Sequence, residues 1–412
     1  MSEMKRTQMN MNKICRRKFI LYFLAVLILS IPIATKAVAD NENIFEKGWH
    51  AMTKNKVIRL IDEVEYKDNN KKSKNIDAVD WSPDGKWIAT KSMLRITIWD
   101  AATHTIRYDM DLSVGGDGFD NLAFSPDSHY LAAGIGSINV WKVADGTLLT
   151  TLIPPQVTPG VRPYAYIQSI RFSPDGKMLV MAYRIDMKHT VIAYRTEDWQ
   201  IAWTYEPQKI VETPRKGITP RITTPLAFTT DSKNVILGTG ECGSENVNFK
   251  QMSRILILDA QSGKLLRSID DIHVMNPTAL AISPDGKMVA TGTMTGGMDQ
   301  TYNEKTHQVV TVDNKDPVRI WSLETGKMVR ELPVHTEVNY LVFSPDGKYL
   351  FGALRDYHTS LTLAVWAVAS GNMVQEVKHS KVPIIMALSP DGKKLAAACQ
   401  SKLSIFEITA GN

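Results

Sequence analysis

A turn of the form Ser-Pro-Asp-Gly recurs seven times between residues 82 and 392, and it restricts the possible fold more than any other feature of the sequence. Proline presets φ at about −65° for the second position of a turn, aspartate can bond to its own backbone, and glycine tolerates a positive φ. The five complete and two degenerate copies are Ser82-Pro-Asp-Gly85, Ser173-Pro-Asp-Gly176, Ser283-Pro-Asp-Gly286, Ser344-Pro-Asp-Gly347, Ser389-Pro-Asp-Gly392, Ser125-Pro-Asp-Ser128 and Thr229-Thr-Asp-Ser232. Because β-rich segments flank each copy, the turns predict seven antiparallel hairpins.

Each hairpin is followed by a third β-rich segment, a second turn and a fourth strand. The third segments end in an aromatic or large apolar residue: Trp99, Trp141, Tyr194, Leu258, Trp321, Trp366 and Phe406. The second turn is clearest at Thr325-Gly-Lys-Met-Val329, where a glycine turn opens an apolar strand. Four strands per unit, repeated seven times, predict an all-β, seven-bladed β-propeller of four-stranded antiparallel blades.

Over about residues 57 to 410 this pattern resembles the WD-repeat family. Val318-Arg-Ile-Trp321 and Ile96-Thr-Ile-Trp-Asp100 carry the family's third-strand ending. The seventh repeat stops after Ile408 without an outer strand, whereas Lys56-Val-Ile-Arg-Leu60 resembles Lys327-Met-Val-Arg-Glu331. We therefore expect the N-terminal strand to complete the last blade, which closes the ring and leaves no open sheet edge where the two ends meet.

Residues 1–39 differ from the repeats and are predicted to be a signal peptide. Basic residues precede an apolar run from Phe19 to Ile33, and Ala37-Val-Ala39 offers a cleavage site. The run has 15 residues, fewer than the roughly 20 that a membrane-spanning helix needs, so we expect cleavage near Ala39, with an uncleaved anchor as the alternative. Arg16-Arg17 also fits a twin-arginine signal, and that route and the general secretory route both place the mature chain in the periplasm or outside the cell. The chain thus resembles a bacterial, exported member of the WD-repeat family. Residues 40–56 are then a linker before a propeller domain of residues 57–412.

The charge and the cysteines limit the partners and the covalent structure. Residues 1–39 hold seven Lys or Arg and one Glu, a net charge of +6, so the rest of the chain carries −1 of the total of +5. This near-neutral remainder argues against nucleic acid as a partner. Only Cys242 and Cys399 remain after cleavage, on distant repeats, so no structural disulfide is expected.

His273, His335 and His379 each precede the serine of a repeated turn by nine or ten residues. In the WD-repeat family a histidine at this place bonds to a second-strand hydroxyl and connects through an aspartate to the third-strand tryptophan. The resemblance therefore implies a structural role for these histidines rather than a metal site. The set closest to the family's network is His273, Thr293, Asp316 and Trp321.

The spacing between turns reveals four insertions, which are about Ile153–Gln168, Glu206–Thr224, Gly240–Arg254 and Thr293–Pro317. Second-to-third and fourth-to-first connections leave a propeller on one face, so we expect a raised rim near blades three to five. Loops on a rigid scaffold carry function, although inert insertions are the alternative. The candidate partner-binding residues mix aromatic and guanidinium groups, as interaction hot spots do. They are Arg162, Tyr164, Tyr166, Arg215 and Arg221.

These features predict an exported non-catalytic scaffold that binds a protein or peptide. The sequence contains no nucleophile elbow, paired-histidine zinc motif or Cys-His arrangement, so no catalytic residue, metal ligand or cofactor is assigned. Acidic and histidine residues in the insertions, such as Glu241, His307 and Asp313, leave a propeller enzyme or a small-ligand or metal-binding sensor at the channel mouth as the alternative. The sequence does not indicate an oligomeric state.

Overall fold

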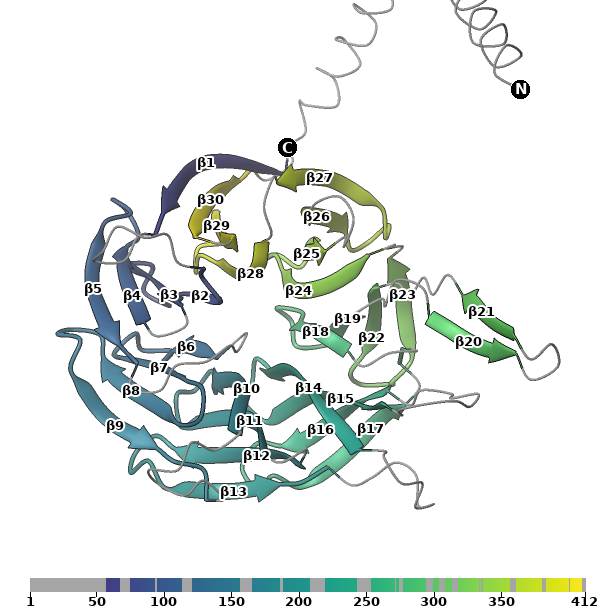
Figure 1. The fold of residues 1–412 in the computed structure, drawn as a ribbon, viewed down its shortest axis with the longest axis horizontal. Coiled ribbons are helices and arrows are strands. Elements are labelled where there is room, and N and C mark those ends of the chain that lie inside the picture. The colour runs from purple at the N-terminus through teal and green to yellow at the C-terminus, as the bar shows by residue number, and fades with distance from the viewer. Residues whose placement is uncertain are drawn as a thin grey trace, which may run out of the picture. The chain divides into compact units, whose positions relative to one another are not determined.

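The computed structural model describes residues 57–66, 75–92, 95–112, 121–155, 165–185, 188–207, 219–242, 253–270, 272–273, 277–293, 299–303, 308–312, 318–332, 334, 336–355, 361–379, 383–399 and 401–409. In these ranges the strands form seven four-stranded antiparallel sheets and one two-stranded hairpin. Figure 1 shows the seven sheets arranged as blades around a central axis. The predicted seven-bladed propeller is confirmed.

Each blade is named by its position along the chain, and its strands are given from the innermost to the outermost. Blades 1 to 4 consist of β2 (Ala78–Trp81), β3 (Trp87–Lys91), β4 (Arg95–Asp100) and β5 (Ile106–Asp111); β6 (Leu122–Phe124), β7 (Tyr130–Gly134), β8 (Ile138–Lys142) and β9 (Leu148–Leu152); β10 (Ala165–Phe172), β11 (Met178–Ile185), β12 (Lys188–Arg195) and β13 (Ile201–Tyr205); and β14 (Thr219–Phe228), β15 (Asn234–Cys242), β16 (Ser253–Asp259) and β17 (Leu265–Asp270).

Blade 5 differs from the others because a hairpin is inserted between its second and third strands. Blades 5 to 7 consist of β18 (Pro277–Ile282), β19 (Met288–Thr293), β22 (Val318–Ser322) and β23 (Met328–Leu332); β24 (Glu337–Phe343), β25 (Tyr349–Arg355), β26 (Leu361–Ala367) and β27 (Met373–His379); and β28 (Pro383–Leu388), β29 (Lys394–Cys399), β30 (Lys402–Ile408) and β1 (Ile58–Glu65). The inserted hairpin consists of β20 (Asp299–Asn303) and β21 (Gln308–Val312).

The Ser-Pro-Asp-Gly turns join the first and second strands of the blades. In blade 1, the Ser82 hydroxyl donates to Asp84 Oδ1 at 2.7 Å and accepts from the Trp87 N–H at 2.8 Å. Gly85 has a φ of +76°, which glycine adopts without the steric cost that a Cβ would bring. The same two bonds to a serine or threonine hydroxyl recur in the other turns, so the recurrent sequence fixes each hairpin directly.

The ring is closed by the N-terminal strand, as predicted. β1 pairs antiparallel with β30, from Ile58 opposite Ile408 to Glu65 opposite Lys402. The innermost strands of neighbouring blades contact one another all the way around, including β2 of blade 1 with β28 of blade 7. All of these strands lie within residues 57–410, which form one compact unit; the chain's other unit lies outside the described residues.

The hydrophobic core is divided among the junctions between blades. At the junction of blades 3 and 4, for example, Val180 and Val191 pack with Trp203 and Leu237, and all four side chains are buried. Each blade therefore buries its two faces against its neighbours, as expected for a propeller.

A side chain at the third position of most outer strands also reaches the next blade, and we call this contact a blade latch. In four blades the side chain donates a hydrogen bond to a backbone carbonyl of the next blade. The acceptor lies in the turn that joins the third and fourth strands of that blade. The donors and acceptors are Tyr108 and Ala144 (2.6 Å), Trp203 and Ala260 (2.8 Å), Arg267 and Glu324 (2.5 Å), and Arg330 and Ser370 (3.2 Å). In β1 the corresponding residue is Asp62, which hydrogen-bonds to His104 of blade 1. Hydrogen bonds therefore support the hydrophobic junctions at the outermost strands of the blades.

Candidate interaction sites

Blades 3 and 4 are longer than blades 1 and 2 at one end. In blade 2 the ladder of β6 and β7 ends at Leu122 opposite Ala133, whereas in blade 3 the ladder of β10 and β11 continues to Ala165 opposite Ile185. Blade 4 likewise continues to Thr219 opposite Cys242. In both blades the start of the first strand pairs with the end of the second, so these extensions lie where the fourth-to-first and second-to-third connections leave.

Two predicted partner-binding residues lie on these extensions. Tyr166 is in β10, opposite Arg184, and Arg221 is in β14, opposite Gly240. The prediction that both lie in loops is wrong, because the antiparallel pairing of blades 3 and 4 continues beyond the ladders of blades 1, 2, 5 and 7. Blade 6 is also long, with Glu337 opposite Arg355. The innermost strands β10 and β14 contact each other, so the structure brings these two backbone positions to neighbouring strands. The other three candidates, Arg162, Tyr164 and Arg215, lie outside the described residues.

The insertion predicted for blade 5 contains the hairpin β20–β21, which the sequence did not suggest. Asp299 pairs with Val312 and Asn303 with Gln308. Figure 1 shows the hairpin beside β23, beyond the circumference of the ring in this view. His307 and Asp313, which were considered for an enzyme or metal site, lie outside the described residues.

His273 is buried in a hydrogen-bonded group within blade 5. Its Nε2 lies 2.8 Å from Thr291 Oγ1, and Trp321 Nε1 donates to the same oxygen at 3.1 Å. The hydroxyl is thus that of Thr291 and not of Thr293, because Thr291 lies two residues beyond the partner of Trp321 in the ladder, Val289. His335 and Asp316 lie outside the described residues, and His379 is the last residue of β27.

Blade 1 repeats the bond between hydroxyl and tryptophan. Trp99 Nε1 donates to Thr90 Oγ1 at 2.8 Å. In blade 6 the equivalent of this threonine is Gly352, and the buried Trp366 Nε1 has no hydrogen-bond partner within the described ranges. A Cβ at Gly352 would lie 2.6 Å from the Trp366 ring, so this blade exchanges the hydroxyl for close packing of the indole.

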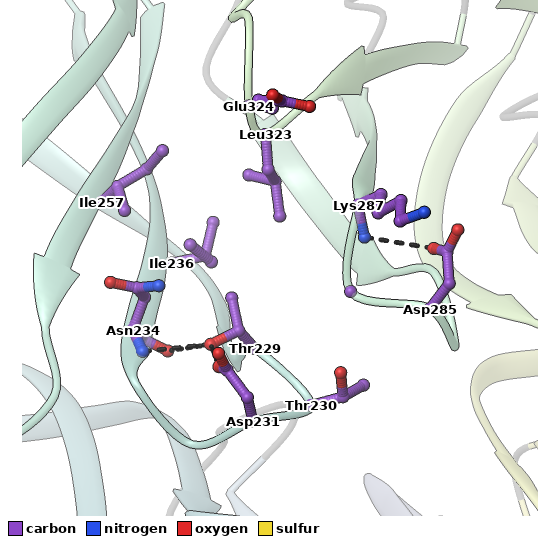
Figure 2. Close-up of a pocket in the computed structure, with 11 residues that line it drawn as sticks. Thr229, Thr230, Asp231, Asn234, Ile236, Ile257, Asp285, Lys287, Leu323 and Glu324 are labelled. Atoms are coloured by element: carbon purple, nitrogen blue, oxygen red, sulfur yellow. Dashed lines mark hydrogen bonds between the residues drawn. The ribbon is translucent and has the colours of Figure 1, made fainter.

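A pocket of about 330 Å³ lies at the junction of blades 4 and 5, on the face that carries the Ser-Pro-Asp-Gly turns. Figure 2 shows its apolar wall, which consists of Ile236 and Ile257 from blade 4 and Leu323 from blade 5. The rim is polar and consists of Thr229, Thr230, Asp231, Asn234, Asp285, Gly286, Lys287 and Glu324. This volume is within the range of ligand-binding pockets, which begins at roughly 300 Å³.

The pocket exists because blade 4 has a short residue where other blades have a large one. Asn234 begins the second strand of its blade and lies opposite Asp259. Residues at this position in five other blades are partly buried against the core: Trp87, Tyr130, Met178, Met288 and Tyr349. The carboxamide of Asn234 occupies less space, so the junction beside it is not filled.

Thr230 is a second local departure, because it replaces the proline of the repeated turn. Its hydroxyl oxygen is 2.8 Å from the position that a Cβ on Gly286 would take. Gly286 has a φ of +71°, so any other residue at this position would be strained as well as crowded. The turns of blades 4 and 5 therefore approach one another closely at the edge of the pocket.

Two carboxylates on the pocket rim are held in the ionised form. The hydrogen bond from Thr229 Oγ1 at 2.7 Å lowers the pKa of Asp231. The hydrogen bond from Ser283 Oγ at 2.5 Å does the same to the pKa of Asp285. Both groups are therefore negatively charged at neutral pH, because hydrogen bonds to the charged form favour it.

No group of three or more His, Cys, Asp and Glu that could hold a metal ion is found in the part of the chain that the structure describes. A search of the same ranges finds no helix long and apolar enough to cross a membrane. The predicted signal peptide at residues 1–39 and the linker at 40–56 lie outside these ranges.

The comparison with protein families finds a match in blades 5 and 6. The model for the WD domain, G-beta repeat, matches residues 326–361, which run from the second turn of blade 5 through β25 of blade 6. No curated protein matches the chain. This repeat and the seven-bladed ring support the WD-repeat propeller family, a class whose members commonly serve as protein-interaction scaffolds.

Proposed function

We propose that this protein is a non-catalytic scaffold that binds a protein or peptide through the face from which the long connections of blades 3 to 5 leave. The propeller fold supports the scaffold role only in general terms, because function resides in particular sites on a fold. The observation that carries the choice of face is the extension of β10, β11, β14 and β15 beyond the ladders of blades 1 and 2.

These extensions favour binding because they offer paired backbone where the long connections of blades 3 and 4 leave the ring. Contacts placed on strands are held more firmly than contacts on loops alone. Tyr166 and Arg221 lie on them, and tyrosine and arginine are enriched among residues that dominate binding energy. Arg162, Tyr164 and Arg215 are close to these strands in sequence, so we propose that all five contribute to one surface.

We further propose that the scaffold works outside the cytoplasm of a bacterium. This part of the proposal rests on the basic and apolar character of residues 1–39 and on the small residues that end at Ala39. The partner would then be a protein or peptide of the periplasm or the cell surface.

Affinity capture from a periplasmic extract tests the proposed surface. The bait is the chain from Asp40, beside a variant in which residues 208–218 and 294–317 are replaced by short turns that leave β14 and β22 intact, and in which Tyr166 and Arg221 are replaced by alanine. A third bait carries Glu197→Gln, which removes an exposed carboxylate on the opposite face. We expect one specific partner on the first and third baits and none on the second, provided that all three unfold cooperatively.

Capture of the same partner by the variant with shortened connections would show that this face is not the binding surface. If none of the three baits retained a specific partner, the scaffold proposal itself would be wrong for this compartment.

A further inference from the structure

We propose that the pocket between blades 4 and 5 is a second recognition site, which binds the arginine side chain of a peptide. The pocket lies on the face opposite the one proposed above for the scaffold's main partner. It combines an apolar wall with a polar rim that carries three carboxylates (Figure 2). This inference does not depend on the binding surface at blades 3 to 5.

The wall of the pocket suits the aliphatic stem of a long side chain. Ile236 is fully buried and Ile257 is 8% exposed, and Leu323 packs against the same junction core. Arginine and lysine place their methylene groups on apolar surfaces of this kind while the charged head stays in a polar environment.

The rim provides negative charge at the mouth of the same cavity. Asp231 is in part neutralised by Lys233, whose ammonium group is 3.4 Å away. Asp285 and Glu324 form no ion pair within 4.0 Å in the described ranges, although Lys287 lines the pocket near Asp285 and the Arg267 guanidinium donates to the Glu324 backbone carbonyl at 2.5 Å. The carboxylates of Asp285 and Glu324 can therefore accept hydrogen bonds from a bound cation. This charge complementarity favours a basic side chain as the ligand.

Arginine fits better than lysine because of the hydrogen bonds that the rim can accept. Asp285 uses Oδ1 for Ser283 and for the Lys287 N–H, which leaves Oδ2 to accept. The Asn234 carboxamide has no hydrogen-bond partner among the described residues and adds a further acceptor oxygen. A planar guanidinium has five donors and can serve several acceptors at once, whereas the compact ammonium of lysine has three.

The absence of a large side chain at Asn234 gives the pocket a direct blocking variant. Tyrosine already occupies the equivalent position in blades 2 and 6, as Tyr130 and Tyr349. We therefore expect Asn234→Tyr to fold and to fill the pocket from within, without any change to the carboxylates of the rim.

The probe is N-acetyl-arginine amide, and the comparison compound is N-acetyl-citrulline amide, which has nearly the same shape without the charge. Binding to the purified full-length chain is followed by NMR of isotope-labelled isoleucine δ1-methyl groups, because Ile236 and Ile257 line the pocket. We expect saturable shifts of these two methyl groups with the arginine compound and an affinity at least about tenfold weaker for citrulline, since a charge-assisted hydrogen bond is lost.

Three variants complete the test. Asn234→Tyr should abolish the shifts, and Glu324→Gln should weaken binding severalfold. Glu197→Gln is the matched control, because Glu197 occupies the equivalent place in the corresponding turn of blade 3, two residues before the residue with positive φ. This control should bind as the parent chain does, and so should the variant with shortened connections, which separates this site from the scaffold surface.

The proposal is overturned if the two methyl groups show no saturable shift, if citrulline binds as tightly as arginine, or if Asn234→Tyr folds and still binds. If Asn234→Tyr does not fold, the decision passes to Glu324→Gln, which changes only an exposed side chain. Unchanged binding by that variant would then overturn the proposal.

Discussion

Individual residues that break the repeat add contacts between neighbouring blades. Four described residues other than glycine have a positive φ: His104, Ser128, Trp199 and Ser232. Ser128 stands where most turns have glycine, and its hydroxyl accepts a hydrogen bond from the backbone N–H of Asp84 in the preceding blade at 2.9 Å. Trp199 meets the ring of Tyr130 edge-on, with the ring centroids 5.9 Å apart. A left-handed residue costs about 1–2 kcal/mol, and such contacts offset this cost.

The sequence could identify the turns that contain Ser128 and Ser232 only as degenerate copies of Ser-Pro-Asp-Gly. The donor to Ser128 lies in another blade, 44 residues away, so its role depends on a contact that a single repeat does not contain. The same holds for His273, whose burial beside Trp321 could be expected from the repeat, while the choice of Thr291 over Thr293 required the register of the strands.

Thr291 and Thr293 provide a matched pair for testing the hydrogen-bonded group of blade 5. Both side chains are fully buried, but among the described residues only the Thr291 hydroxyl has partners, which are His273, Trp321 and the Arg319 carbonyl. Thr291→Val should lower the free energy of unfolding by about 2 kcal/mol, because it leaves buried polar groups unpaired. Thr293→Val should be neutral or stabilising, since the hydroxyl that it removes has no partner among the described residues. Urea unfolding of both variants measures the difference, and equal losses would refute the assigned network.

The strands, as elements, were the most predictable part of this molecule. The turns fix where each hairpin lies, and the incomplete seventh repeat fixes which strand closes the ring, so the number and order of strands followed from local sequence. Two features of the same strands were missed. The blade latches lie at an ordinary third position of the outer strands, and Asn234 looks like any polar residue at the start of a strand. An alignment of the seven repeats against one another would have been needed to recognise the latch residues and the short side chain of Asn234.

The latch between blade 7 and blade 1 should make ring closure sensitive to acid. The hydrogen bond from His104 lowers the pKa of Asp62 below its usual value of 3.8. A carboxyl with a lowered pKa contributes stability above that usual value and loses the contribution as the pH falls through its pKa in the folded protein. Asp62→Asn should therefore be less stable than the parent chain at pH 5.5, and this deficit should shrink towards pH 3.

Urea unfolding at a series of pH values measures this dependence. Glu407→Gln is the control, because Glu407 lies in the same blade but forms only an exposed pair with Arg59, of the kind that contributes little. A deficit for Asp62→Asn that stays constant down to pH 3 would show that the carboxylate of Asp62 does not support the closed ring.

At the scale of the whole molecule, a closed ring separates two faces with different properties. One face carries the short turns and the pocket between blades 4 and 5. The other carries the ends of the extended strands of blades 3 and 4. The sequence predicted the asymmetry from the spacing between turns, because insertions lengthen that spacing whatever structure they adopt. It did not predict that Tyr166 and Arg221 lie in strands, since the turn pattern marks the closed end of each hairpin and not how far its pairing continues.

Hydrogen exchange of the chain, with and without the captured partner, locates the binding face on individual strands. We expect slower exchange in the bound state at the extended ends of blades 3 and 4. These ends are Ala165–Ile167 with Tyr183–Ile185, and Thr219–Ile222 with Thr239–Cys242. Exchange in the Ser-Pro-Asp-Gly turns should be unchanged. Slower exchange confined to those turns, with none at the extended strands, would contradict the proposed binding face.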